Sequence, residues 1–133
     1  MIVYLDANIV IYLIEQPLHW GPRAAARYAA LRAAGDEVVI SDLLRLECRV
    51  GPLRSGNVRM LARFDAFFAA PDVRVVPVSD RVCERAGQVR ATYRFKALDS
   101  LHLAAAIVHG CDRFLTNDAR LNACTDIAVE VLP

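Results

Sequence analysis

The chain opens with Met1-Ile2-Val3-Tyr4-Leu5-Asp6, a short apolar run that ends on a carboxylate. Because Ile2–Leu5 consists of β-forming residues without alternating polar positions, the run predicts a strand buried on both faces, as the strands of parallel sheets are. Four further short apolar runs follow, at residues 38–40, 73–78, 113–116 and 127–131. The sequence therefore predicts a mostly parallel sheet of about five strands.

The intervals between these runs show helical spacing of apolar residues, at 9–14, 23–34, 58–68, 82–93 and 98–108. A further helix is expected from residue 43, with Leu43, Leu46 and Val50 as its buried stripe. Gly51-Pro52 and Ser55-Gly56 are expected to mark the turn after that helix. Strands that alternate with helices indicate an α/β protein, here a single domain over residues 1–133 built as a three-layer α/β/α sandwich.

Composition narrows the class of protein. A length of 133 residues fits one domain, and with 56% hydrophobic and 23% charged residues the chain has enough apolar surface to fold. The start of the chain lacks a basic region followed by a long apolar segment, and no run of about 18 apolar residues occurs. A cytoplasmic protein without a membrane partner is therefore expected. The four cysteines and three histidines lack the spacing of a zinc site.

Charge is distributed unevenly along the chain. The net charge is +1, but residues 45–96 contain 11 of the 16 basic residues and five of the 15 acidic ones. The even total argues against a protein that simply coats nucleic acid, whereas the basic central segment suits a local contact with phosphate. Arginine binds phosphate in a bidentate manner, and the candidates are Arg49, Arg54, Arg59 and Arg63. A solvated helix face or an acidic partner segment would suit the same side chains.

Four carboxylates stand at positions that a core-forming sequence would not give them. Asp6 and Asp118 each follow a predicted strand, Glu47 falls within the apolar stripe of its helix, and Asp99 begins the most apolar helix of the chain. Each also has an ordinary structural explanation. Asp6 and Asp99 suit a helix N-terminus, Asp118 suits a turn, and Glu47 suits an ion pair with the arginine two residues before or after it.

In a parallel sheet the carboxyl ends of the strands meet at one edge, where ligands bind. The four carboxylates are expected to converge there, and two unit charges about 4 Å apart repel by roughly 4 kcal/mol at an effective dielectric near 20. A cation that prefers oxygen ligands, Mg²⁺ or Mn²⁺ rather than Zn²⁺, would relieve that repulsion. The neighbouring polar side chains suited to support such a site are Asn8, Ser41, Thr116 and Asn117.

Four motifs carry a resemblance to a known family. They are Val3-Tyr4-Leu5-Asp6-Ala7-Asn8, Ser41-Asp42-Leu43-Leu44-Arg45-Leu46-Glu47, Ala97-Leu98-Asp99-Ser100-Leu101-His102-Leu103-Ala104-Ala105-Ala106 and Phe114-Leu115-Thr116-Asn117-Asp118. With these motifs in this order and spacing, the chain resembles the PIN-domain ribonucleases, most closely the small VapC-type toxins of bacterial toxin–antitoxin pairs. The resemblance implies a PIN-like fold and Mg²⁺- or Mn²⁺-dependent endonucleolytic cleavage of RNA.

The resemblance also implies roles and partners. Asp6 and Asp99 would be the direct metal ligands, and Glu47 and Asp118 would complete the site, with Asn117 as the alternative to Asp118 at the fourth position. The family further implies a homodimer. It implies a cognate antitoxin as well, which lays a helix in a groove beside the active site and brings an arginine to the acids.

Two other functions stay open from the residues. A non-catalytic PIN-like module that binds RNA or protein would be expected to lack one of the acids, and all four are present. A phosphatase of the haloacid-dehalogenase type also has an Asp after its first strand, but it expects a second Asp where this chain has Asn8. Metal-assisted phosphodiester hydrolysis needs no histidine nucleophile, so His102, one helical turn after Asp99, is expected to pack or to form a hydrogen bond.

Overall fold

The computed structural model describes all 133 residues, and one sheet of five strands lies at its centre. The strands run in the order β3-β2-β1-β4-β5 and comprise β1 (Ile2–Leu5), β2 (Glu37–Ser41), β3 (Val73–Val76), β4 (Arg113–Thr116) and β5 (Ala128–Val131). Every neighbouring pair is parallel. The parallel five-stranded sheet predicted from the apolar runs is confirmed, with β1 as its central strand.

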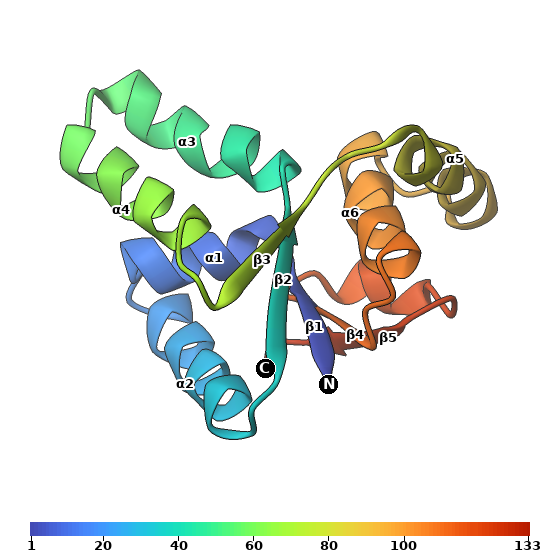
Figure 1. Cartoon of the computed structure of the whole chain (residues 1–133), viewed down its shortest axis with the longest axis horizontal. Coiled ribbons are helices and arrows are strands. Elements are labelled where there is room, and N and C mark those ends of the chain that lie inside the picture. The colour runs from blue at the N-terminus through green and yellow to red at the C-terminus, as the bar shows by residue number, and fades with distance from the viewer.

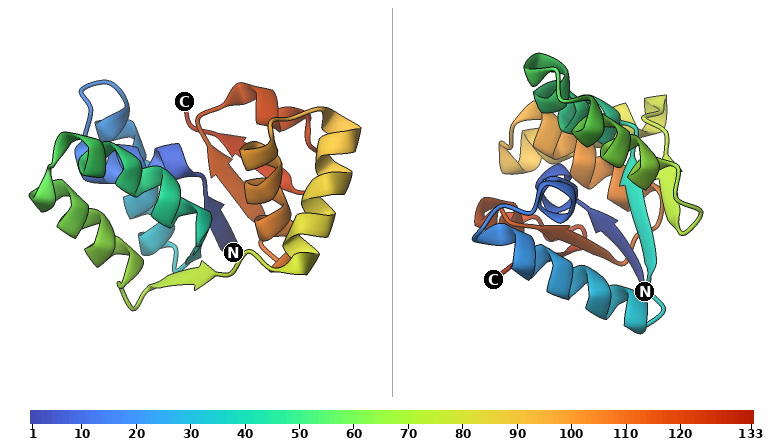
Figure 2. Two further views of the ribbon diagram at one scale, coloured as in Figure 1. Left: turned by 90° about the horizontal axis from the view of Figure 1, so that it is seen from above. Right: turned by 90° about the vertical axis from the view of Figure 1, so that its left-hand side faces the viewer.

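Helices cover both faces of the sheet (Figure 1). One face carries α1 (Ala7–Glu15), α2 (Trp20–Ala33), α3 (Leu43–Ser55) and α4 (Val58–Phe68), and the other carries α5 (Asp80–Tyr93) and α6 (Ala97–Val108). A short 3-10 helix, η1 (Ala119–Ala123), joins β4 to β5. Figure 2 shows the two groups of helices on either side of the strands. The three-layer arrangement is thus confirmed, and none of its helices is long and apolar enough to cross a membrane.

The strands build two separate cores because successive side chains of a strand point to opposite faces of the sheet. In β1, Val3 and Leu5 pack with the helices α1 to α4, whereas Tyr4 packs on the side of α5 and α6. All three side chains are fully buried, which stabilises each apolar one by about 1.5–3 kcal/mol relative to an exposed position. Burial on both faces holds β1 in the middle of the molecule and thereby fixes the position of Asp6, which follows it.

Helix α3 turns a different face to the core from the one predicted. Its buried side chains lie at residues 44, 48 and 52, whereas Leu46 is 60% exposed, Leu53 is 57% exposed and Val50 is exposed as well. The prediction that Leu46 and Val50 belong to a buried stripe was therefore wrong. Because both sets of residues recur at helical spacing, α3 has two apolar faces, and Glu47 lies at the border between them rather than within a buried stripe.

Of the two turn signals predicted here, Gly51-Pro52 was wrong, since α3 continues through both residues to Ser55, whereas Ser55-Gly56 is where the helix ends. A proline inside a helix removes one backbone hydrogen bond and normally kinks or ends the helix. Here Pro52 is one of the three buried residues of α3, and its burial contributes apolar surface to the helix packing. The helix ends instead at Gly56, whose φ of +68° is a conformation that glycine adopts at little cost.

The carboxyl ends of the three central strands lie side by side. The register pairs Leu5 of β1 with Leu115 of β4, and the backbone N–H of Asp6 donates to the carbonyl of Leu115 at 2.9 Å. On the other side of β1, strand β2 ends at Ser41, directly before α3. The residues that follow β1, β2 and β4 therefore meet at one edge of the sheet, as the parallel topology predicts.

Candidate active site

Asp6 is the central carboxylate of this edge and is only 7% exposed. It is the N-cap of α1, because Oδ1 accepts a hydrogen bond from the backbone N–H of Ala7 at 2.9 Å. Its second oxygen, Oδ2, accepts from the hydroxyl of Thr116 at 2.7 Å. No cationic side chain forms an ion pair with it. Asp6 is thus both a helix cap and a buried negative charge, supported by Thr116 as expected from the sequence.

Asp118 lies beside Asp6, one strand away, and is held by Arg120. As the N-cap of η1, its Oδ1 accepts from the backbone N–H and from Nε of Arg120, both at 3.0 Å. The same guanidinium lies 3.7 Å from Asp99. The hydrogen bond from Arg120 holds the pKa of Asp118 below its ordinary value. Arg120 is 64% exposed, and nothing in the sequence indicated that it would fold back onto the predicted site.

Asp99 lies in the first turn of α6 and completes this group. Burial raises the pKa of Asp99 above its ordinary value, and the negative charge of Asp6 raises it further. Asp118 acts in the same direction, whereas Arg120 and His102 oppose the shift. The structure therefore brings three of the four predicted carboxylates together, and the net effect of their surroundings is to disfavour the ionised form of Asp99.

Glu47 lies on α3, and its partner is a histidine rather than an arginine. The ion pair with Arg45 or Arg49 that would have explained Glu47 structurally is absent, because Arg45 pairs with Asp42 at 2.9 Å and Arg49 pairs with Asp65 at 3.1 Å. The carboxylate of Glu47 instead bonds to Nε2 of His102 on α6. A hydrogen-bonding role for His102 is therefore confirmed.

A buried tyrosine, which the sequence did not single out, extends this contact. The hydroxyl of Tyr4 lies 2.7 Å from Nδ1 of His102 and 2.7 Å from the hydroxyl of Ser41. Ser41 was expected to support the acidic site, but its hydroxyl bonds to Tyr4 rather than to a carboxylate. Burial raises the pKa of Tyr4 far above its ordinary value, so the phenol stays protonated at physiological pH. Tyr4 thus links β1 and β2 to the His102–Glu47 pair.

Asn8 and Asn117 bond to each other instead of to a carboxylate. Nδ2 of Asn8 donates to Oδ1 of Asn117 at 3.2 Å, and Nδ2 of Asn117 donates to the hydroxyl of Tyr12 at 2.7 Å. The amide of Asn117 is therefore engaged with α1, whereas Asp118 is the neighbour whose charge acts on Asp99. This geometry favours Asp118 over Asn117 as the side chain at the fourth position of the site.

The chemistry of the donor set fits a hard divalent cation. The four acids offer only oxygen ligands, which suit Mg²⁺ or Mn²⁺. No three histidine, cysteine, aspartate or glutamate side chains are gathered tightly enough to form a ready-made metal site. Arg120 is nevertheless the only cation in an ion pair with the three aspartates of the site, and Asp6 adds to the rise in the pKa of Asp99 that burial produces. A bound cation would remove this imbalance.

The four arginines expected to contact phosphate lie on α3 and α4. Arg49 pairs with Asp65 at 3.1 Å, whereas Arg54, Arg59 and Arg63 are exposed and form no ion pair. Arg59 and Arg63 line a hollow of about 380 Å³ together with Asn57 and Met60. Three of the four candidates are therefore free to meet an anionic partner.

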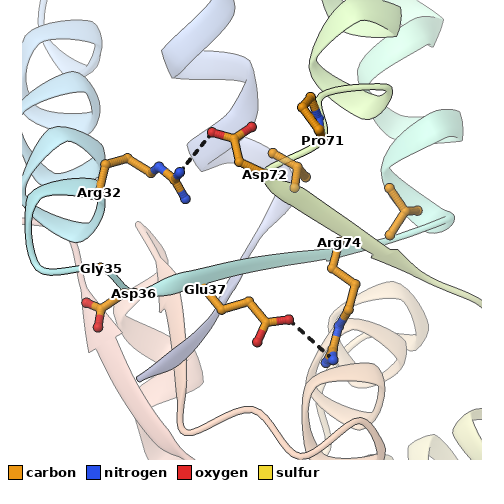
Figure 3. Close-up of a pocket in the computed structure, with 9 residues that line it drawn as sticks. Arg32, Gly35, Asp36, Glu37, Pro71, Asp72 and Arg74 are labelled. Carbon is orange, nitrogen blue, oxygen red and sulfur yellow. Dashed lines mark ion pairs between the residues drawn. The ribbon is translucent and has the colours of Figure 1, made fainter.

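A larger hollow, of about 680 Å³, lies at the opposite edge of the sheet, by the amino ends of β2 and β3 (Figure 3). Its charged side chains neutralise one another, since Arg32 pairs with Asp72 at 3.0 Å and Arg74 pairs with Glu37 at 3.3 Å. It contains no carboxylate without a cationic neighbour and no candidate nucleophile. The acid cluster is a shallow site outside both hollows, and we assign function to its charge rather than to the size of a cavity.

The fold and this edge define an α/β protein with an acidic site at the carboxyl ends of its parallel strands. Comparison with family models gives a match to the PIN domain over residues 3–126. The chain therefore belongs to the PIN-domain family. A comparison with curated protein sequences gave no match.

Solved structures with the same fold come from toxin–antitoxin complexes and toxins. VapBC2 from Rickettsia felis, bound to a promoter DNA fragment, is 18% identical, with a TM-score of 0.81 and all of both chains covered. A toxin–antitoxin complex from Klebsiella pneumoniae is 22% identical, with a TM-score of 0.75 and 98% of each chain covered. Mycobacterium tuberculosis VapC20, a sarcin–ricin-loop-cleaving toxin, is 19% identical, with a TM-score of 0.78 and coverage of 98% and 99%. At these identities the likeness establishes the fold.

Proposed function

We propose that this protein is a Mg²⁺-dependent endoribonuclease and the toxin of a toxin–antitoxin pair. One observation carries the proposal: in a PIN domain, Asp6, Asp99 and Asp118 converge at the carboxyl edge of the sheet with too little positive charge to balance them. Such a site is costly unless it binds a cation, and the cation is then available to a phosphate group.

The role proposed for each acid is supported by its surroundings. Asp6 and Asp99 are the direct ligands, because Asp6 is fixed by Thr116 and its own helix, and Asp99 lies in the first turn of α6. Glu47 and Asp118 complete the site, orient water and accept its proton. Mn²⁺, which prefers the same ligands, is expected to replace Mg²⁺.

When bound, Mg²⁺ would supply positive charge beside the scissile phosphate and would lower the pKa of a water molecule. The residues of this chain determine where that occurs. The rigid ends of β1 and β4 hold Asp6 and Asp118, so the carboxylates need little rearrangement. Arg54, Arg59 and Arg63 are exposed on the neighbouring helices, where they are proposed to bind the RNA backbone.

The partner proposed for this toxin is an antitoxin with an acidic amphipathic helix. Its binding surface is the exposed apolar stripe of α3, formed by Leu46, Val50 and Leu53, beside the unpaired Arg54. An apolar stripe flanked by positive charge complements such a helix. Leu53→Asp is expected to leave RNA cleavage unchanged while weakening inhibition by the cognate antitoxin at least tenfold.

The protein is also proposed to be a homodimer. Sedimentation equilibrium tests this by measuring the mass of the protein in solution.

The activity is tested with purified protein and RNA in the presence of Mg²⁺ and of EDTA. The wild-type chain is expected to cleave only with Mg²⁺ or Mn²⁺, and Asp6→Asn is expected to abolish cleavage while the protein still folds. Sequencing of RNA ends after brief induction, beside the same variant, identifies the cleaved RNA. Cleavage by Asp6→Asn at the wild-type rate would contradict the proposal. A wild-type chain that binds RNA without cleaving it would favour a non-catalytic module.

A further inference from the structure

His102 is the one histidine that the fold encloses, with a side chain only 1% exposed. Both of its ring nitrogens have partners: Nε2 bonds to the carboxylate of Glu47, and Nδ1 lies 2.7 Å from the hydroxyl of Tyr4. Tyr4 in turn bonds to Ser41 at 2.7 Å. These four side chains come from α6, α3, β1 and β2, and α6 also carries Asp99 one helical turn earlier.

We infer that His102 is a positioning residue, which holds the Glu47 carboxylate at the acidic edge of the sheet through Nε2 while the Tyr4–Ser41 pair fixes the plane of its ring. The inference rests on the proposed function, because Glu47 is a site residue only if the edge binds a metal. It gives a role to the buried side chains of His102 and Tyr4, which take no part in the proposed hydrolysis.

Glu47 needs such a partner because nothing else in the structure holds it. Its side chain extends from the border of α3, is partly exposed, and has several freely rotating bonds. The two arginines nearest to it in the sequence are engaged with Asp42 and Asp65. The only hydrogen bond of its carboxylate is the one to His102. Without that contact the carboxylate would be free to turn away from the site.

His102 can serve as a fixed support because its ring is enclosed and oriented from both sides. The Tyr4 ring meets the His102 ring edge-on, with centroids 5.8 Å apart, and is itself stacked on Phe114 at 5.3 Å. A ring fixed in this way directs Nε2 along one line, toward Glu47. Groups that orient a metal ligand in this manner typically change metal affinity or activity by 10–100-fold when they are removed.

Two substitutions of similar size separate positioning from packing. In His102→Gln the amide nitrogen reaches the place of Nε2 and retains a donor for Glu47, whereas in His102→Asn the shorter amide reaches only the place of Nδ1 and retains the contact with Tyr4. Calorimetric titration of each full-length variant with Mg²⁺, in the absence of RNA, measures the metal site directly. Thermal unfolding of the same metal-free samples measures the packing.

We expect His102→Asn to weaken Mg²⁺ binding by about tenfold or more, and His102→Gln to remain within about threefold of wild type. The two variants are expected to unfold at similar temperatures. In a Glu47→Ala background, His102→Asn is expected to produce no further loss of Mg²⁺ affinity. Tyr4→Phe, which removes only one hydroxyl, provides a variant that folds readily, and we expect it to weaken Mg²⁺ binding by about threefold.

Equal Mg²⁺ affinity in all these variants and the wild type would overturn the role of His102 and leave the proposed function intact. A loss in His102→Asn that persists undiminished in the Glu47→Ala background would overturn it as well, because the effect would not pass through Glu47. A wild-type chain that neither binds Mg²⁺ nor cleaves RNA would instead contradict the proposed function, and the inference would fall with it.

Discussion

The two edges of the sheet carry the same kinds of residue and differ in how their charges are balanced. At the amino edge, Asp72 and Glu37 each have an arginine within 3.3 Å, and Asp36 has the chain's own N-terminal amine at 2.9 Å. At the carboxyl edge, Asp6 has no cationic partner, and Arg120 is shared between Asp118 and Asp99. Among these acids, only those at the carboxyl edge lack a cation of their own.

The site is therefore identified by the balance of charge around its carboxylates rather than by the size of a cavity. The larger hollow of the protein lies at the amino edge, where each acid that lines it has a cationic partner. At the carboxyl edge burial raises the pKa of Asp99, and the negative charge of Asp6 raises it further. An edge with uncompensated carboxylates is prepared for a cation, whereas an edge of closed ion pairs contributes at most a little stability.

The largest expected effect is on RNA cleavage and compares one substitution at each edge. Asp99→Asn is expected to reduce the rate of Mg²⁺-dependent cleavage by at least about 100-fold, because a direct ligand is lost. Asp72→Asn, at the amino edge, is expected to retain the wild-type rate. Initial rates on a fluorescent RNA substrate at saturating Mg²⁺ measure both. Equal losses in the two variants would remove the distinction between the edges.

The next effect concerns Arg120, the single cation of the carboxyl edge. In Arg120→Gln the oxygens of Asp118 are released, so we expect Mg²⁺ to bind about three- to tenfold more tightly. Isothermal titration calorimetry of the metal-free protein measures the change. Arg32→Gln, which frees Asp72 at the other edge, is the matched control and is expected to leave Mg²⁺ affinity unchanged. Weaker binding in Arg120→Gln would mean that the arginine orients Asp118 instead of competing with the metal.

In the metal-free protein, Asp99→Asn is expected to change the free energy of unfolding in the opposite direction from the removal of an ordinary surface acid. Because the pKa of Asp99 is raised in the folded state, its ionised form destabilises the fold, and this loss grows as the pH rises above the ordinary value of 3.8. Asp99→Asn is therefore expected to stabilise the metal-free protein by about 1 kcal/mol at pH 7 and to bring no gain below pH 3.8. Urea unfolding at both pH values, in EDTA, checks the sign. Destabilisation at pH 7 would contradict it.

The smallest effect is expected at the amino edge. Glu37→Gln breaks the ion pair with Arg74, and both side chains are nearly half exposed, so the loss of stability is expected to be at most about 0.5 kcal/mol at pH 7. RNA cleavage and Mg²⁺ affinity are expected to stay at wild-type values. A loss above about 2 kcal/mol would show that this edge is not the passive surface that its closed ion pairs indicate.

The sheet and the acids were predictable because both depend on local sequence. Short apolar runs such as Ile2–Leu5 predict buried parallel strands, and parallel topology then places the residues after them at one edge. Asp6 and Asp118 follow from that rule, whereas Asp99 was expected at the edge because it begins the most apolar helix of the chain. The face that α3 turns to the core was not predictable, because Leu46 and its neighbours form a second apolar stripe and periodicity does not say which stripe is buried.

The contacts that tune the site were not predictable, because they join residues far apart in the chain. In the sequence, Tyr4 is indistinguishable from the other apolar residues of its strand. Its contact with His102, 98 positions away, forms only when β1 and α6 pack together. The bond between His102 and Glu47 likewise depends on how α3 leaves the sheet. Arg120 reaches Asp118 through the tight turn of η1, which no residue pattern indicated. Spacing thus predicts which groups approach the edge, and packing determines how they are bonded.

The most direct test of the uncompensated edge is a crystal of the wild-type protein soaked in Mn²⁺, measured by anomalous X-ray scattering. Mn²⁺ prefers the ligands of Mg²⁺ and can be located by its own signal. We predict an anomalous peak between Asp6 and Asp99 at the carboxyl edge, with none in the hollow at the amino edge. A peak at the amino edge, or the absence of any peak beside Asp6 at millimolar Mn²⁺, would contradict the assignment of a metal site to this protein.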